Sequence, residues 1–151
     1  MNDMSKYESS LKIVDLYFSK FNFENKRILG TTRIKTSCNI QHFGDEDHNQ
    51  VVVITMLITT ENNGLNLSVE LTGKFKLDNS HELSEELSKE ILLKNTVAIM
   101  MPYIRSQISL LTTQPGIPPI MLPLIDVNQL LDDKDVVIDH YEAPKDNNTS
   151  K

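Results

Sequence analysis

The sequence predicts an α+β fold: a four-stranded antiparallel sheet followed by a long helix, a proline-rich loop and a short C-terminal helix. Apolar and polar residues alternate over 65–77, as on a strand with one buried face, whereas after Asn79 the apolar residues recur at helical spacings. The turn sequence Asn62-Asn63-Gly64 between two extended segments is typical of a hairpin. The 151 residues suit one domain. We expect it over 1–138, with a flexible polar tail over 139–151.

The first two predicted strands are the least regular. Residues 11–18 are rich in branched and aromatic side chains, although Val14 and Asp15 break the alternation. From Arg27 to Ile40 apolar residues alternate weakly with polar and charged ones, which predicts a second, more exposed strand. A polar turn is expected at 42–49.

The next two strands form the predicted hairpin. Residues 51–60 are largely β-branched and carry apolar side chains on both faces. One helical layer would cover only one of these faces, so something further is expected to cover the other. In 65–77 the apolar side chains share one face; they are Leu65, Leu67, Val69, Leu71, Phe75 and Leu77.

The helix is predicted from Asn79 to the stop signal Gln114-Pro115-Gly116, with Asn79 and Glu82 as a capping box. Its apolar stripe consists of Leu83, Leu87, Ile91, Ala98, Met101, Ile104, Ile108 and Leu111. Pro102 lies inside and is expected to kink the helix or split it into two. A second short helix is expected from Asp126 to Leu131.

The sequence carries no familiar catalytic signature. It has no Gly-rich phosphate loop, no nucleophile elbow and no His-Glu-x-x-His pair, so we expect no catalytic residue, no metal and no cofactor. The acidic turn at 45–48 could hold a cation, but its consecutive ligands lack a coordinating frame, which favours a solvated turn. A net charge of −6 argues against a nucleic-acid partner.

Cysteine content and hydropathy bear on the cellular compartment. Cys38 is the one cysteine, so no intrachain disulfide can form, and a reducing cytoplasmic location is expected. A small buried side chain is favoured over a nucleophile there. Residues 1–10 do not resemble a secretory signal, so the mature chain is expected to begin there. The apolar runs at 51–56 and 97–101 are too short to insert in a membrane.

The loop at 114–124 combines four prolines with apolar residues and is therefore expected to be extended and partly exposed. One interpretation is a crossover loop packed on the core. The other is one wall of a groove that binds peptides.

Residues 101–105 read Met-Pro-Tyr-Ile-Arg, and Ile108 and Ile117-Pro118 follow them. This stretch resembles the Phe-Pro-Tyr-Ala-Arg helix signature of the SecB family of cytosolic export chaperones, and the later residues stand at the family spacing. The hairpin at 50–77 also resembles the family's third and fourth strands, including Gly73 and Phe75. The order of elements agrees from about 11 to 131. The resemblance implies a homotetramer, a dimer of dimers that holds unfolded polypeptides in apolar grooves, without enzymatic activity or cofactor.

The resemblance also suggests roles for individual residues. Clients would bind at Ile117, Pro118, Ile120, Met121 and Leu122, with further aromatic surface from Tyr17, Phe18, Phe21 and Phe23, for each of which core packing is the alternative. Leu67, Val69 and Leu71 would lie on the face that meets helices near subunit interfaces.

A partner motor, SecA, would dock on an acidic sheet surface. Glu24 matches one acidic position there, but Lys20 replaces its acidic neighbour, and Asn66 and Ser68 replace a Leu and a Glu. An antitoxin-specific chaperone therefore remains an alternative to an export chaperone. An adaptor that holds one folded partner is a third.

Overall fold

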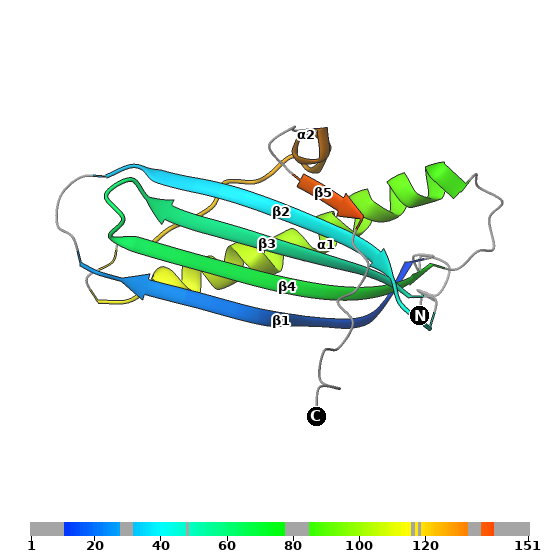
Figure 1. The fold of residues 1–151 in the computed structure, drawn as a ribbon, viewed down its shortest axis with the longest axis horizontal. Coiled ribbons are helices and arrows are strands. Elements are labelled where there is room, and N and C mark those ends of the chain that lie inside the picture. Colours follow the sequence, from blue (N-terminus) through cyan, green and yellow to red (C-terminus); the bar gives the residue numbers. More distant parts are fainter. Residues whose placement is uncertain are drawn as a thin grey trace, which may run out of the picture.

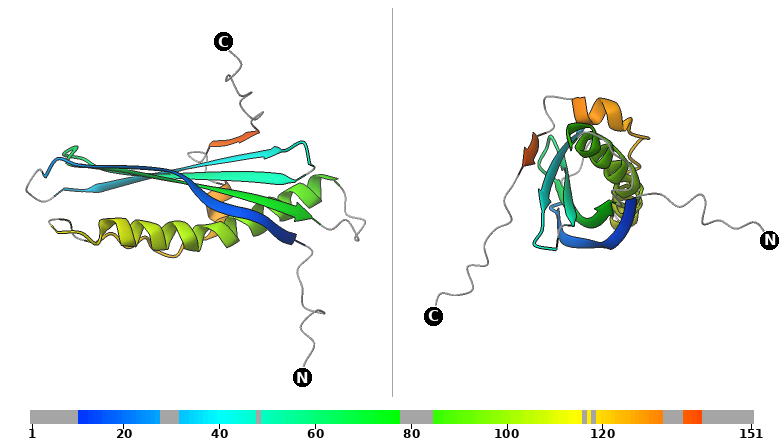
Figure 2. Two further views of the ribbon diagram at one scale, coloured as in Figure 1. Left: turned by 90° about the horizontal axis from the view of Figure 1, so that it is seen from below. Right: turned by 90° about the vertical axis from the view of Figure 1, so that its right-hand side faces the viewer.

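In the part of the chain that the structure describes, one sheet is crossed by a long helix, and a short second helix follows. The computed structural model describes residues 11–27, 32–47, 49–77, 85–115, 117, 119–132 and 137–140. Its strands are β1 (Leu11–Asn25), β2 (Ile34–Gly44), β3 (Gln50–Thr60), β4 (Leu65–Leu77) and β5 (Val137–His140), and its helices are α1 (Glu85–Thr112) and α2 (Val127–Asp132). The strand order is β1-β4-β3-β2-β5, with α1 forming a second layer on one face (Figures 1 and 2). The predicted α+β class is confirmed.

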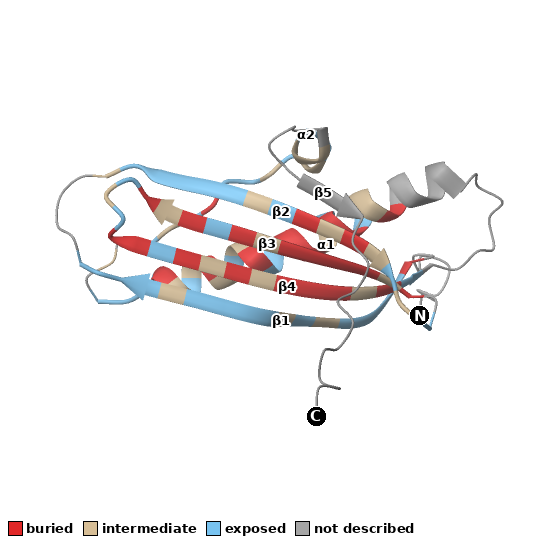
Figure 3. Cartoon of the chain, viewed as in Figure 1, coloured by how far each residue is buried: buried red, intermediate tan, exposed pale blue. Residues whose placement is uncertain are grey.

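The central hairpin of β3 and β4 supplies most of the buried surface. Across it, Ile54 pairs with Leu71, Met56 with Val69 and Ile58 with Leu67. All six side chains are buried and belong to the cluster that packs against α1 (Figure 3). Burying one such side chain contributes roughly 1.5–3 kcal/mol, so this face is the main driving force for folding.

The other face of β3 carries Val51 and Val53, which are buried, and Leu57, which is 37% exposed. In the described part of the chain, no helix covers this face, because α1 and α2 lie together on the opposite side of the sheet (Figure 2). The further layer expected from the doubly apolar pattern is therefore not found among these residues.

The first strand is longer than predicted, because β1 continues from Phe18 to Asn25. Register shifts in its pairing with β4 lie between Ile13 and Asp15 and between Phe18 and Lys20. Each shift inserts one extra residue and resets which side chains face the helix. Leu16, Phe18 and Phe23 consequently pack against the core although the sequence does not alternate regularly.

The second strand begins at Ile34 rather than Arg27 and runs to Gly44, so the following turn is shorter than predicted. Arg27 instead adopts a left-handed conformation, with φ of 55°. Residues 39–42 of β2 also pair in parallel with the unpredicted strand β5. β5 spans the predicted boundary between 138 and 139, and the rest of the predicted tail lies outside the described residues.

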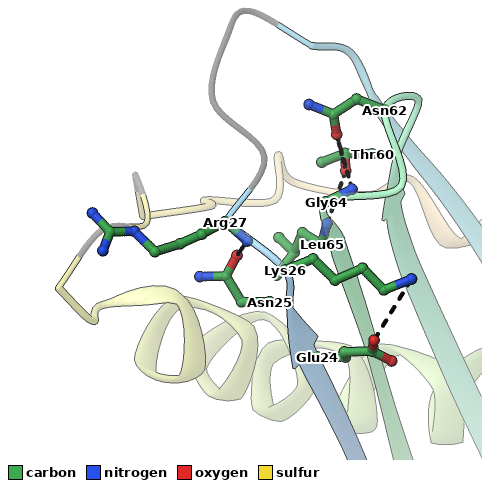
Figure 4. A network of polar contacts seen from close by, with 8 residues as sticks. All are labelled: Glu24, Asn25, Lys26, Arg27, Thr60, Asn62, Gly64 and Leu65. Atoms are coloured by element: carbon green, nitrogen blue, oxygen red, sulfur yellow. Dashed lines mark hydrogen bonds and ion pairs between the residues drawn. The ribbon is translucent and has the colours of Figure 1, made fainter.

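The predicted turn between β3 and β4 is confirmed (Figure 4). Asn63 is left-handed, with φ of 56°. The Asn62 side-chain oxygen accepts hydrogen bonds from the Gly64 amide at 3.0 Å and the Thr60 hydroxyl at 2.8 Å. The Thr60 hydroxyl in turn accepts the Leu65 amide at 3.0 Å. These bonds fix the register of the central hairpin.

The long helix is continuous through Pro102, so the predicted split does not occur. Pro102 cannot donate to the carbonyl of Ala98, but both residues are exposed, and water can satisfy that carbonyl. The prediction that Ala98 belongs to the buried stripe is therefore wrong. Over 92–112, the part of α1 whose side chains the structure describes, the buried positions are Leu92, Thr96, Val97, Met100, Met101, Ile104, Ile108 and Thr112. The predicted cap at Asn79 lies outside the described residues.

The second helix starts with the predicted cap. The Asp126 carboxylate accepts the amides of Asn128 at 2.9 Å and Gln129 at 3.3 Å. Its apolar residues Leu130 and Leu131 pack against the core. None of the described helices is long and apolar enough to cross a bilayer.

Gly73 lets the helix approach the sheet closely. A Cβ atom at this position would lie 2.5 Å from Cε2 of Phe75 and 3.1 Å from Sδ of Met100, both of which are fully buried. We therefore expect Gly73→Ala to destabilise the protein by about 1–3 kcal/mol through overpacking, measured by urea unfolding. At the exposed Gly44 the nearest atom to such a Cβ lies at 3.9 Å. Gly44→Ala should leave stability within about 0.5 kcal/mol, and equal losses for the two variants would contradict this account.

Candidate functional site

An open groove lies between the solvent-facing side of α1 and the loop that returns along it. Its volume is about 540 Å³. Leu122 at its base is buried, whereas Met121 on its rim is 81% exposed. The residues that line it are Pro102, Arg105, Ser106, Ser109, Leu110, Met121 and Leu122.

Side chains of α1 hold the loop in place through its backbone. Arg105 donates from Nε at 3.2 Å and from Nη2 at 3.1 Å to the carbonyl of Leu122. The Ser109 hydroxyl donates to the Ile120 carbonyl at 3.4 Å. The buried Thr112 hydroxyl accepts the Ile120 amide at 2.8 Å and donates to the Ile108 carbonyl at 2.8 Å. Arg105, Ser109 and Thr112 follow one stripe of the helix, so the loop is a preformed wall.

The loop presents its side chains alternately because it is extended. Ile120 is half-buried and Leu122 is buried, and both pack against the core, whereas Met121 between them points to solvent. Leu124 in the loop is 86% exposed and Leu110 on the helix is 67% exposed. Single exposed apolar side chains are common, but several beside one groove mark a binding surface.

The structure separates the five predicted loop residues. Met121 and Leu122 line the groove, whereas Ile117 and Ile120 are half-buried outside its lining. Pro118 lies outside the described residues. Sequence analysis missed the groove residues of α1, among them Arg105 and Leu110. The sequence did place both residues outside the predicted apolar stripe of the helix, which could have indicated that they face away from the sheet.

The predicted β1 aromatics lie away from the groove. β1 and α2 lie on opposite sides of α1 (Figure 2). Phe18 and Phe23 pack against the core, in line with the alternative of core packing. Phe21 is 45% exposed, with its ring centroid 5.2 Å from that of Phe18, and Tyr17 is 43% exposed. Among the residues that line the groove there is none from β1.

Leu67, Val69 and Leu71 lie beneath the chain's own α1, each at most 1% exposed. The helix and sheet of one chain already cover these side chains. They therefore offer no free surface to a neighbouring subunit.

The face of the sheet turned away from α1 carries mixed charge. Glu24 is exposed, and its Oε1 lies 3.7 Å from Nζ of Lys26 (Figure 4). Lys20 stands opposite Glu70 in the register of β1 and β4, and Asn66 stands opposite Glu24. By strand register, the charged side chains of β1 to β4 on this face are Lys12, Asp15, Lys20, Glu24, Lys35, Glu70, Lys74 and Lys76. Lysines outnumber carboxylates, so the strands carry no acidic surface.

Hydrogen bonds to Asp45 stabilise the acidic turn between β2 and β3. The Asp45 carboxylate accepts the Asp47 amide at 3.0 Å and the Asn49 amide at 2.8 Å. Desolvation raises the pKa of Asp45, but these hydrogen bonds and the charge of Lys74 outweigh it, so the pKa is lowered. Among the described residues no three His, Cys, Asp or Glu side chains are grouped to hold a metal ion.

Cys38 is half-buried on β2 and packs against the core. Burial raises the pKa of its thiol to about 11. The thiol therefore stays protonated at neutral pH and is a poor nucleophile, as the sequence analysis expected.

The hydrogen bond from the Ile120 amide to the Thr112 hydroxyl can be tested by substitution at Thr112. Thr112→Val keeps the side-chain shape but leaves the Ile120 amide without its acceptor, which should cost about 1–3 kcal/mol. We expect faster hydrogen exchange of that amide and of its neighbours, measured by mass spectrometry. Thr112→Ser retains the hydroxyl and should stay close to wild type. Unchanged exchange in the Val variant would mean that apolar packing alone holds the loop.

Comparison with known proteins agrees with this architecture. The chain is 27% identical over 151 residues to the protein-export protein SecB of Orientia tsutsugamushi, covering 93% of this chain and 90% of that one. It is 34% identical over 62 residues to the protein of the same name from Anaplasma phagocytophilum, covering 41% of this chain and 39% of that one. An uncharacterized protein of Methanocaldococcus jannaschii is 34% identical over 87 residues, covering 56% and 48%. The chain thus matches less than half the length of the latter two relatives.

Among solved structures, a Mycobacterium tuberculosis SecB-like chaperone in complex with a ChAD peptide from the HigA1 antitoxin has a similar fold. The TM-score is 0.61 at 17% identity, over 77% of this chain and 88% of that one. The family model for preprotein translocase subunit SecB matches residues 5–136. That match covers most of the chain, and the protein therefore belongs to the SecB family.

Proposed function

We propose that this protein is a chaperone that holds unfolded polypeptides by binding their apolar segments in the groove between α1 and the loop. The observation that carries this proposal is the exposed apolar set Leu110, Met121 and Leu124 beside a wall fixed by hydrogen bonds. Because the wall is preformed, a client loses entropy on binding but the groove loses little. SecB-family chaperones are not enzymes, and the protein acts by binding alone.

A dedicated client is the second candidate, favoured by two observations. The similar M. tuberculosis chaperone carries a peptide from an antitoxin. In addition, lysines outnumber carboxylates on the outer sheet face, so docking of an export motor through an acidic surface at Glu24 has little support. Isolation of the native complex decides between SecA with precursors and one antitoxin. A folded partner alone would favour an adaptor.

We also propose a cytoplasmic homotetramer. β1 is a fifteen-residue edge strand, and in the described part of the chain its outer edge pairs with no strand. Ile13 and Val14 on it are 50% and 52% exposed. Such an edge invites pairing with another chain. β5 partly covers the opposite edge of the sheet, at residues 39–42 of β2, so β1 is the longer free edge.

Client binding is tested at Met121. Purified protein should slow the aggregation of a chemically unfolded client, measured by light scattering. Met121→Asp should weaken client binding about tenfold or more, since it removes apolar contact worth about 1.5–3 kcal/mol. The control Ile34→Asp alters a side chain on β2 that is 49% exposed and is not among the residues that line the groove. The proposed function fails if wild-type protein does not bind unfolded clients, and the groove assignment fails if both variants bind equally.

Self-association is tested at the β1 edge. Light scattering after size exclusion should give the mass of four 17.2 kDa chains. Ile13→Lys with Val14→Lys should shift this mass downward, because lysine on an edge strand opposes pairing. Ile34→Lys on β2 should not. A wild-type mass of one chain would remove the tetramer proposal.

A further inference from the structure

We propose that the outer edge of β2 is a second surface for self-association, which β5 covers and which adds β2 of a second copy when β5 detaches. The β1 edge, at the other margin of the sheet, is the surface proposed for the native oligomer. The β2 edge would join copies only when it is uncovered.

The first argument is that β2 lacks the features by which an exposed edge strand avoids pairing. Such strands usually carry several charges, a proline or a bulge. Lys35 is the one Lys, Arg, Asp or Glu residue of β2, the strand contains no proline, and its register with β3 runs from Ile34 to Gly44 without a shift. In contrast, β1 carries two lysines and two carboxylates and pairs with β4 through two register shifts. β2 is therefore a regular edge that depends on a cover.

The second argument is that β5 supplies this cover by strand pairing. It lies beside β2 in Figure 1 and pairs in parallel with residues 39–42. In the described part of the chain, residues 34–38 have no strand partner on this side. Because alternate residues of a strand direct their N–H and C=O groups to opposite sides, this stretch offers about two or three pairing positions. An added strand needs more of β2 than that, so β5 prevents its addition.

The third argument is that β5 is held more weakly than the other strands. Its four residues pair with β2 alone in the described part of the chain, whereas β3 and β4 each pair along both edges. Parallel pairing is also slightly less stable per residue than antiparallel pairing. Local opening occurs where few contacts must break. We therefore expect β5 to detach while the central hairpin stays folded.

A second copy fits the uncovered edge because its own β2 has the same length and regularity. Two antiparallel β2 strands related by a two-fold axis would pair reciprocally, as in the commonest symmetric interfaces. Ile34, Thr36 and Ser37 are exposed on this strand, and their side chains are short or β-branched, which suits a strand pair. The paired β2 strands would continue the sheet from one copy into the next.

Proline in β5 tests this inference. Ile138→Pro with Asp139→Pro removes two consecutive backbone N–H groups, so at least one bond of the parallel pairing is lost. Amides of residues 38–43 should exchange about tenfold faster, measured by mass spectrometry, while those of β3 stay protected. The mass from light scattering after size exclusion should exceed that of wild-type protein and rise with concentration. Thr36→Lys in the same variant should restore the wild-type mass, because lysine on an edge strand opposes pairing.

The control is Asn147→Pro with Asn148→Pro, which places the same change after β5 in the sequence and should keep the wild-type exchange and mass. Equal association of the two proline variants overturns this inference, as does unchanged exchange at 38–43. Faster exchange without a rise in mass also overturns it, and tighter binding of an unfolded client would then assign the edge to clients. Each comparison is made with wild-type protein, so a wild-type mass of one chain removes the tetramer proposal and leaves this test intact.

Discussion

The packing of α1 on the apolar face of β3 and β4 is the contact on which the rest of the structure depends. Val69, Leu71 and Ile104 are fully or almost fully buried in this layer, and Gly73 permits the close approach. Because the sheet covers one side of the helix, the other side remains available for the returning loop. The groove is thus a consequence of having one helix across one sheet.

Apolar contact and backbone hydrogen bonds share the task of shaping the groove. Leu122 anchors the loop in the core, and Arg105 and Thr112 bond its backbone. A single such bond contributes roughly 0.5–1.5 kcal/mol net. This division leaves the Met121 side chain free on a wall whose backbone is held. A surface built in this way can bind many sequences without refolding, which suits a chaperone.

Charge is distributed unevenly over the same scaffold. The chain is acidic overall, yet the strands β1 to β4 carry more lysines than carboxylates on their outer face. Exposed pairs such as Glu24 with Lys26 contribute about 0–1 kcal/mol, so this distribution matters less for stability than for the choice of partner. The sheet face and the groove therefore have separate chemical characters.

Local periodicity by itself determined the central hairpin, its turn at Asn63, the long helix and the cap at Asp126, since each depends on residues close in sequence. Only the tertiary structure decided the length of β1, because its bulges form by pairing with β4. The same holds for the groove. Arg105 and the Leu122 carbonyl are seventeen positions apart, and their contact depends on where the loop crosses the helix. No repeat in the sequence encodes that crossing, because it results from the packing of Leu122 into a core built by distant strands.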